Sequence, residues 1–238
     1  MDQMQMTPQA AFAAGSTVSA ERITAFLRKV YGWMFVGLGI TATVALGVSS
    51  SPTIGRAIFG NKILFFGLMI AEIGLVFYLS ARVNKLSASA AAGLFLLYSA
   101  LNGATLAFIF LAYTGTSIAT TFVVTAGMFG ALALFGTTTK RSLAGVGQFV
   151  FMGLIGVILA SVVGMFWKSE GLQFIISIVG VIVFTGLTAW DAQRLKVMAA
   201  TVPEDRYGSY SVVGALALYL DFINLFLFML RFMGGRRD

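Results

Sequence analysis

The sequence predicts an all-α polytopic membrane protein with seven transmembrane helices. Of its 238 residues, 58% are hydrophobic and only 11% are charged, whereas soluble domains are typically about 45–50% apolar and about 25% charged. The apolar residues fall into runs of about 20, and a helix of that length crosses the roughly 30 Å hydrocarbon core of a bilayer. Because the runs are continuous rather than alternating, we expect membrane-spanning helices and not the strands of a barrel.

The seven apolar runs follow one another along the chain and are separated by short polar clusters. Their predicted bounds are Val30–Val48, Ile63–Ala81, Ala90–Ala112, Ile118–Phe135, Val146–Trp167, Leu172–Trp190 and Val213–Phe232. Residues 29–238 are therefore expected to form one seven-helix transmembrane domain. Residues 1–28 are polar, small and weakly patterned, and they lack the basic start and short apolar core of a signal peptide. They are predicted to be a mobile N-terminal tail.

Basic residues between the runs predict the orientation in the membrane. With a cytoplasmic N-terminus, the inner segments hold Arg22, Arg28, Lys29, Arg82, Lys85, Lys140, Arg141, Arg194, Lys196 and Arg206, and the outer segments hold Arg56, Lys62 and Lys168. The net charge of +7 therefore reports the orientation of a multi-pass protein whose partner is the lipid bilayer, and not binding to nucleic acid. Seven full crossings place Arg236 and Arg237 outside, whereas basic residues are expected on the cytoplasmic side. A last segment that re-enters the membrane without crossing it therefore stays open as an alternative.

The chain contains no cysteine and no histidine. Thiolate nucleophiles, disulfides and His/Cys zinc sites are therefore excluded, and the usual histidine proton shuttle is absent. Neither a GxxxxGK[ST] phosphate loop nor a GxGxxG turn after a strand is present. We therefore expect neither enzyme activity nor a cofactor, and any response to pH must come from carboxylates.

Ionisable residues within the apolar runs are informative, because each costs roughly 2.5–3.5 kcal/mol at the membrane centre and needs a partner or water. Those at or inside the second, sixth and seventh runs are Glu72, Arg82, Asp191, Asp221 and Arg231. Two neutral amides, Asn102 and Asn224, also lie in apolar runs, and we expect them to make polar contacts between helices.

Three of the charges are predicted to meet on the inner half of the membrane. At a rise of about 1.5 Å per residue, Asp221 lies on the order of 10 Å deep, while Arg82 and Asp191 lie near the inner surface. Two neighbouring carboxylates cannot both ionise cheaply, and an adjacent arginine competes to keep one of them charged. This trio is therefore a candidate pH sensor and gate: a shared proton would hold two helices together, and its loss would admit a cation such as calcium, in transient contact with the aspartates.

A second level of the bundle is predicted to hold a structural ion pair. Glu72 precedes Arg82 by ten residues, just as Asp221 precedes Arg231 by ten. If Arg82 is level with Asp221 on these antiparallel helices, then Glu72 is level with Arg231, about 15 Å further out. Because one acid with one base is neutral, Glu72 and Arg231 are expected to stabilise the bundle without a further role.

Three segments of the chain resemble the hallmark stretches of the transmembrane Bax-inhibitor-motif family, in its bacterial branch. They are YSALNGATLAFIFLAYTGTSI (Tyr98–Ile118), GLTAWDAQRLK (Gly186–Lys196) and LALYLDFINLFLFMLR (Leu216–Arg231). The resemblance covers the membrane region from Val30 onward. It implies two three-helix layers around a central C-terminal helix, and a pH-sensitive calcium leak gated by paired aspartates. On matching positions these are Asp191 and Asp221, with Arg82 as the arginine that latches the closed form.

Two other hypotheses stay open. Bacterial members of the family are associated with membrane protein quality control through a membrane-bound protease, which implies a regulatory interaction protein that acts through its N-terminal tail. Two aspartates on adjacent helices are also what an intramembrane aspartyl protease needs. The second aspartate, however, stands in LYLDFIN without the glycines that flank it in such enzymes. The principal prediction is the leak, with calcium as the permeant ion.

Overall fold

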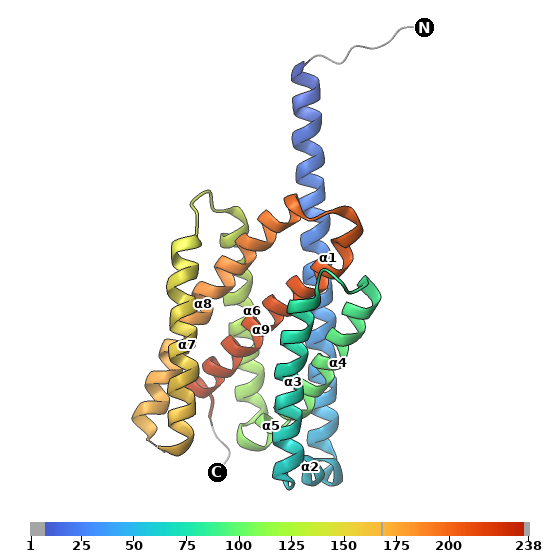
Figure 1. The fold of residues 1–238 in the computed structure, drawn as a ribbon. Helices are drawn as coiled ribbons and strands as arrows, with labels where there is room; N and C mark the ends of the chain where they lie inside the picture. Colours follow the sequence, from blue (N-terminus) through green and yellow to red (C-terminus); the bar gives the residue numbers. More distant parts are fainter. Residues whose placement is uncertain (1–7, 168, 236–238) are drawn as a thin grey trace.

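The computed structural model describes residues 8–167 and 169–235, and within these ranges the chain is built from helices joined by short connections (Figure 1). The helices are α1 Pro8–Ser50, α2 Pro52–Phe59, α3 Lys62–Arg82, α4 Ala88–Leu106, α5 Ile109–Ala112, α6 Gly115–Thr138, α7 Ala144–Phe166, α8 Glu170–Thr201 and α9 Tyr207–Met233, with a 3-10 turn at Glu204–Arg206. Seven segments of the described chain are long and apolar enough to cross a membrane. The predicted fold class is therefore confirmed.

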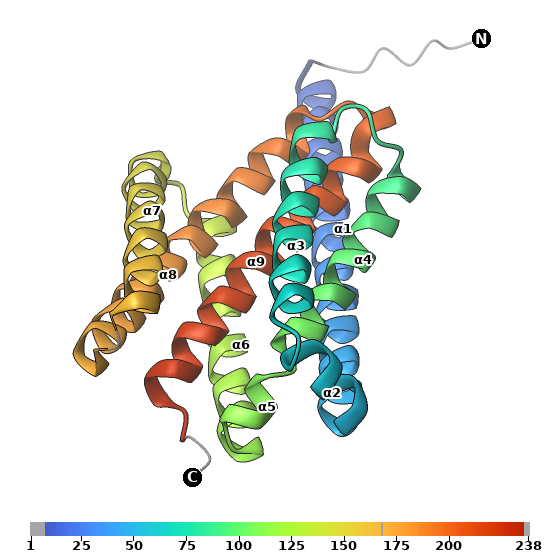
Figure 2. The same ribbon diagram turned by 60° about the horizontal axis from the view of Figure 1, so that its bottom comes forward.

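The seven long helices form two groups of three around α9. In one group α4 packs against α1 and α3, and in the other α8 packs against α6 and α7. Helix α9 runs obliquely between the groups and contacts α1, α4, α6 and α8 (Figure 2). In the most apolar 18-residue stretch of α9, 61% of the residues are buried, a larger share than in any other span of the described chain. The central C-terminal helix and the two three-helix layers agree with the prediction.

Polar residues between the spans end one helix and begin the next. The side chains of Ser51, Asn61, Ser87, Thr114 and Ser169 each accept a hydrogen bond from a backbone N–H in the first turn of the helix that follows. Such N-caps satisfy donors that have no partner inside the helix. These capping residues explain why the helices begin where the apolar runs do, within a few residues.

Helix α1 begins at Pro8, well before the first predicted span at Val30. Phe26 is fully buried and its ring lies 5.0 Å from that of Tyr207. Arg22 donates a hydrogen bond to the carbonyl of Val202, and the Tyr207 hydroxyl donates to the carbonyl of Arg22. The end of the predicted mobile tail is thus helical and packed against the start of α9. Residues 1–7 of that tail lie outside the described residues.

Helix α8 continues past the predicted end of the sixth span at Trp190 as far as Thr201. The added turns have an apolar face, because Ala192, Leu195 and Ala199 are all buried at helical spacing. Asp191 therefore lies inside a continuous helix and not at its end. The third predicted span is instead divided between α4 and the short α5.

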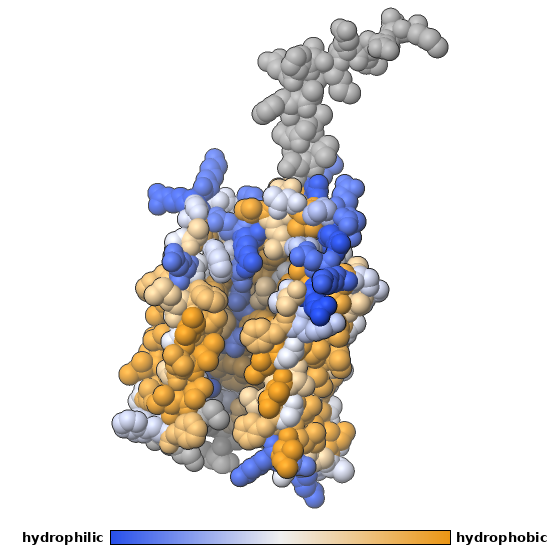
Figure 3. Space-filling model, viewed as in Figure 1, coloured by the Kyte–Doolittle hydropathy of each residue, from blue (hydrophilic) through white to orange (hydrophobic). Residues whose placement is uncertain are grey.

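The outer surface of the bundle matches a bilayer. Large apolar side chains such as Phe35, Ile63 and Phe149 are mostly exposed. They form a broad hydrophobic band with hydrophilic residues at both ends of the molecule (Figure 3). The start of α1 and the end of α9 lie at opposite ends of the bundle (Figure 1). Helix α9 is long and apolar enough to be the seventh crossing.

Candidate functional site

Asp191 of α8 and Asp221 of α9 face each other where these two helices pack together. Their carboxyl groups are close enough to form a hydrogen bond with each other. Asp221 is only 5% exposed, and Asp191 is half-buried. An ionised carboxylate only accepts hydrogen bonds, so a bond between two carboxyl groups requires that one of them carries a proton. The two predicted aspartates are thus together in the structure, in a contact that needs a proton.

The buried side of this contact has no other donor. The Oδ2 atom of Asp221 is inaccessible to solvent and has no hydrogen-bond partner among the described residues. Leaving a buried polar atom unsatisfied costs about 1–3 kcal/mol, and more when it is charged. A proton on the pair lowers that cost, because a protonated carboxyl group carries no charge and can donate a hydrogen bond. The geometry therefore favours a pair that holds one proton.

A cavity of about 420 Å³ lies beside the pair, between α3, α8 and α9. Its lining includes Ser80 of α3 and Val83 directly after that helix, Asp191 and Arg194 of α8, and Tyr210 of α9. Asp221 is not in the lining, so it lies behind Asp191 as seen from the cavity. Hydrophilic residues are visible in a hollow between the apolar surfaces of α3 and α7 (Figure 3). A cation in the cavity would therefore meet Asp191 first.

Arg194, and not Arg82, is the arginine at the aspartates, which corrects the predicted trio. Arg194 lines the cavity. It lies one helical turn after Asp191 and interacts electrostatically with it. Arg82 is exposed at the end of α3 and is not part of the lining, although its neighbours Ser80 and Val83 are. Spacing along a helix does not give the direction of a side chain. The latch role remains a prediction.

Tight packing fixes the part of α8 that carries Asp191. A Cβ on Gly147 of α7 would collide with the ring of Trp190, and a Cβ on Gly136 of α6 would collide with the carbonyl of Ala189. Glycine at these two positions lets α6 and α7 approach α8 closely on either side of the aspartate. The guanidinium of Arg194 lies 5.7 Å from the centre of the Trp190 ring, within the range of a cation–π contact.

Glu72 and Arg231 do not form the predicted ion pair. Glu72 accepts hydrogen bonds from Asn102 Nδ2 (3.0 Å) and Thr105 Oγ1 (2.9 Å), both on α4. Arg231 instead donates to Gln173 Oε1 (3.3 Å) on α8. The reason is that α4 packs against both α3 and α9, so Glu72 meets α4 before it can reach α9. The carboxylate of Glu72 is therefore held by neutral hydrogen-bond donors and not by an arginine.

The bonds to Glu72 belong to a larger buried network. The Tyr219 hydroxyl donates to Asn102 Oδ1 (2.9 Å) and lies 2.6 Å from Thr41 Oγ1. Thr41 also lies 2.9 Å from the carbonyl oxygen of Ser99. The network therefore connects α1, α3, α4 and α9, and Asn102 makes polar contacts between helices. Tyr219 was missed from the sequence, although a hydroxyl in an apolar run signals a need for a partner.

Asn224, the other amide singled out in the sequence, behaves differently. Its Nδ2 donates to the carbonyl of Leu220 (2.8 Å), one turn earlier on the same helix. Its hydrogen bond therefore satisfies the amide within α9 and does not link two helices.

The aspartate pair offers few ligands for a metal ion. Among the described residues, no group of three or more Asp, Glu, His or Cys side chains could hold one. Calcium takes six to eight oxygen ligands, and the pair supplies two carboxyl groups. Water would have to supply much of the rest, so the arrangement suits a passing cation rather than a resident one.

Comparison with known proteins places the same region of the chain in a recognised group. Residues 23–238 match the family model described as "Inhibitor of apoptosis-promoting Bax1". The chain is 52% identical over 215 residues to the "Inner membrane protein YbhL" of Escherichia coli K12, covering 89% of this chain and 92% of that protein. It is 47% identical over 215 residues to an uncharacterized protein of Borreliella burgdorferi, covering 90% and 93%. An uncharacterized membrane protein of Streptococcus pyogenes serotype M1 is 35% identical over 224 residues, covering 93% and 97%.

Proposed function

This chain belongs to the Bax inhibitor family of multi-pass membrane proteins, and from that premise we propose that it is a pH-sensitive calcium leak channel of the bacterial inner membrane. The observation that carries the proposal is the contact between the carboxyl groups of Asp191 and Asp221, one on each of two packed helices. The relatives named above support the membrane location, and the leak is inferred from the geometry of the pair together with the family resemblance.

The gate works through one proton. While the pair shares it, the hydrogen bond holds α8 against α9 and the leak is closed. When it leaves, both carboxylates are charged, and two unit charges about 4 Å apart repel each other by about 4 kcal/mol at the effective dielectric typical of proteins. That repulsion exceeds the free energy of one ordinary hydrogen bond, about 0.5–1.5 kcal/mol. The helices can then separate, or a cation can enter and neutralise the pair.

The cavity gives the cation a route to the pair. It lies toward the end of the bundle that carries most of the basic residues, which is the cytoplasmic end if the N-terminus is cytoplasmic. Arg194 stands in this cavity beside Asp191 and competes with an incoming cation for the carboxylate. We therefore assign the latch to Arg194, with Arg82 as the alternative that the family resemblance implies.

Calcium flux into proteoliposomes tests the proposal. Full-length protein is reconstituted into vesicles that contain a calcium-sensitive dye, and influx is followed at external pH values from about 6 to 8, the range in which a coupled carboxyl pair can titrate. We expect influx to increase with pH, because the shared proton is lost as the pH rises. Protein-free vesicles at each pH are the control. Influx equal to that control would contradict the leak. Influx above the control that does not change with pH would contradict the gate.

A second candidate is a regulatory protein of membrane protein quality control, a modulator of a membrane-bound protease without transport activity. The observation in its favour is that the N-terminal part of α1 extends beyond the bundle (Figure 1), where a soluble part of a partner could reach it. Deletion of residues 2–19 tests this role and spares Arg22 and Phe26, which pack against the C-terminal part of the chain. Loss of the effect on protease substrates with unchanged calcium flux would support the regulatory role.

A further inference from the structure

An apolar groove of about 620 Å³ runs between α1 and α6, on a different face from the aspartate cavity and with no lining residue in common with it. Phe222 of α9 lies between its two walls. The α6 wall includes the small residues Ala126, Gly130 and Ala133, which make it hollow. Phe35 on the α1 wall is 81% exposed. The groove is thus open on the surface that faces the lipid.

The groove has the length and the lining that a lipid chain requires. On α6 it extends from Phe122 to Thr137, which is about 22 Å at the rise of an α-helix. One leaflet of the hydrocarbon core is about 15 Å thick, so a chain lying obliquely fits along it. Polar groups are confined to Tyr31 and Thr137, at the same end of the groove. A headgroup is therefore expected at that end and an acyl chain along the rest.

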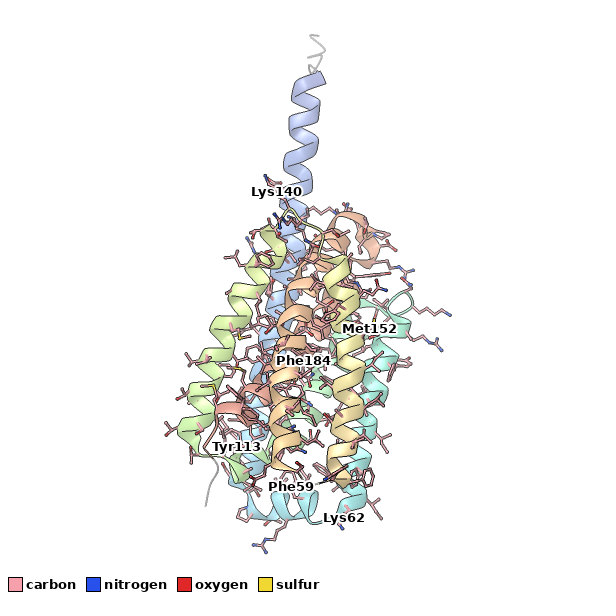
Figure 4. The ribbon with its side chains drawn as sticks, turned by 90° about the vertical axis from the view of Figure 1, so that its left-hand side faces the viewer. Phe59, Lys62, Tyr113, Lys140, Met152 and Phe184 are labelled. Carbon is pink, nitrogen blue, oxygen red and sulfur yellow. The ribbon has the colours of Figure 1, made fainter. Side chains whose placement is uncertain are left out.

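Cations surround this polar end. Arg28 lies one turn before Tyr31 on α1, and Lys140 and Arg141 directly follow the end of α6; all three are exposed. Figure 4 shows Lys140 at the end of the bundle from which α1 extends. Lys196 donates to the Thr137 carbonyl (2.7 Å) and so fixes the end of α6. No acidic residue lines the groove.

We propose that this groove binds an anionic phospholipid, with one acyl chain between α1 and α6 and the phosphate at Arg28, Lys140 and Arg141. Basic pockets between transmembrane helices are a known way to bind anionic headgroups. Arginine adds charge-assisted hydrogen bonds to phosphate oxygens. The excess of cations over carboxylates is what selects an anionic lipid over a zwitterionic one. This site is independent of the leak, because it uses none of the residues of the aspartate pair.

Lipid binding to the purified full-length protein tests the headgroup part. Native mass spectrometry in detergent would count bound phosphatidylglycerol and, separately, phosphatidylcholine with the same acyl chains. We expect one retained phosphatidylglycerol and much weaker retention of phosphatidylcholine. The double variant Lys140→Gln/Arg141→Gln should bind phosphatidylglycerol roughly 30-fold more weakly, from two cations near the headgroup. The matched control Arg56→Gln/Lys62→Gln removes the same charges at the other end of the bundle and should bind as the unchanged protein does.

Two glycines of α6 test the acyl-chain part. A Cβ at Gly130 or at Gly127 meets no atom within 4 Å, but only Gly130 lines the groove. Gly130→Phe should therefore fill the groove and abolish retention of phosphatidylglycerol, while Gly127→Phe should keep it. Equal retention of the two lipids, equal effects of the two double variants, or equal effects of the two phenylalanines would overturn the proposal. A lipid-free dimer that is disrupted by Gly130→Phe and not by Gly127→Phe would also overturn the proposal. The groove would then bind a second copy of the chain.

Discussion

The carboxyl group of Asp221 lies against that of Asp191, and each belongs to a different one of two helices that pack along their length. One aspartate is buried on the central helix, and the other lines a cavity. A proton between them therefore joins two structural elements rather than two atoms of a local loop. Any change in protonation acts directly on the contact between α8 and α9.

Replacing either aspartate with asparagine should abolish the dependence of calcium flux on pH. In Asp221→Asn, the amide Nδ2 can donate a hydrogen bond to Asp191 at every pH, so the contact no longer needs a shared proton. We expect influx in proteoliposomes to stay at the low level of the unchanged protein at pH of about 6, and not to increase by pH of about 8.

Asp205→Asn is the matched control for this experiment. Asp205 is exposed and pairs with Arg206 at 3.0 Å, away from the cavity. Its replacement removes one carboxylate without touching the gate, so the pH dependence should be unchanged. If Asp221→Asn still responds to pH as the unchanged protein does, the proton acts at another site.

Arg194→Gln should increase calcium flux more than Arg82→Gln does. Removing the guanidinium at Arg194 takes away the cation that competes for Asp191, so a permeating cation binds the carboxylate more easily. Arg82 is outside the cavity lining, and its replacement tests the assignment that the family resemblance implies. The measurement is the initial rate of influx at a single pH at which the unchanged protein is partly open. A larger effect of Arg82→Gln would return the latch to that residue.

The number of helices and the central position of α9 could be predicted because a bilayer imposes them. A run of about 20 apolar residues has one stable structure in lipid. A helix that carries Asp221 must also be shielded from that lipid. The start of α1 was harder to predict, because the burial of Phe26 depends on Tyr207, a residue distant in the sequence.

Rotation about the helix axes could not be predicted, and it decided which polar residues meet. A run that is apolar on every side has no polar face from which to infer its orientation. The predicted level of Glu72 was also wrong: Glu72 is linked through Asn102 to Tyr219, twelve residues before Arg231 on α9. Asp191 and Asp221 met because α8 and α9 are consecutive in sequence and pack together. Arg194 could have been found, since it lies one helical turn after Asp191.

Asn102→Leu should lower the stability of the protein more than Asn224→Leu. The first change removes a donor from Glu72 and an acceptor from Tyr219, which leaves two buried polar groups without these partners. Each costs about 1–3 kcal/mol. The second removes a bond within one helix, to the carbonyl of Leu220. The measurement is the thermal unfolding midpoint in detergent. Equal midpoints for the two variants would show that the network contributes little to stability.

Gly136→Ala should separate α6 from α8 and disturb the gate, whereas Gly127→Ala should not. The added methyl at Gly136 would collide with the backbone carbonyl of Ala189, two residues before Asp191. Backbone cannot move aside as a flexible side chain can, so the helices must shift, at a cost typical of overpacking, about 1–3 kcal/mol. At Gly127 the methyl meets no atom within 4 Å, and alanine is the better helix former. We expect a lower unfolding midpoint together with altered pH dependence of calcium flux in Gly136→Ala alone. A Gly136→Ala protein with a lower midpoint but an unchanged pH profile would mean that the position of α8 does not control the aspartate pair.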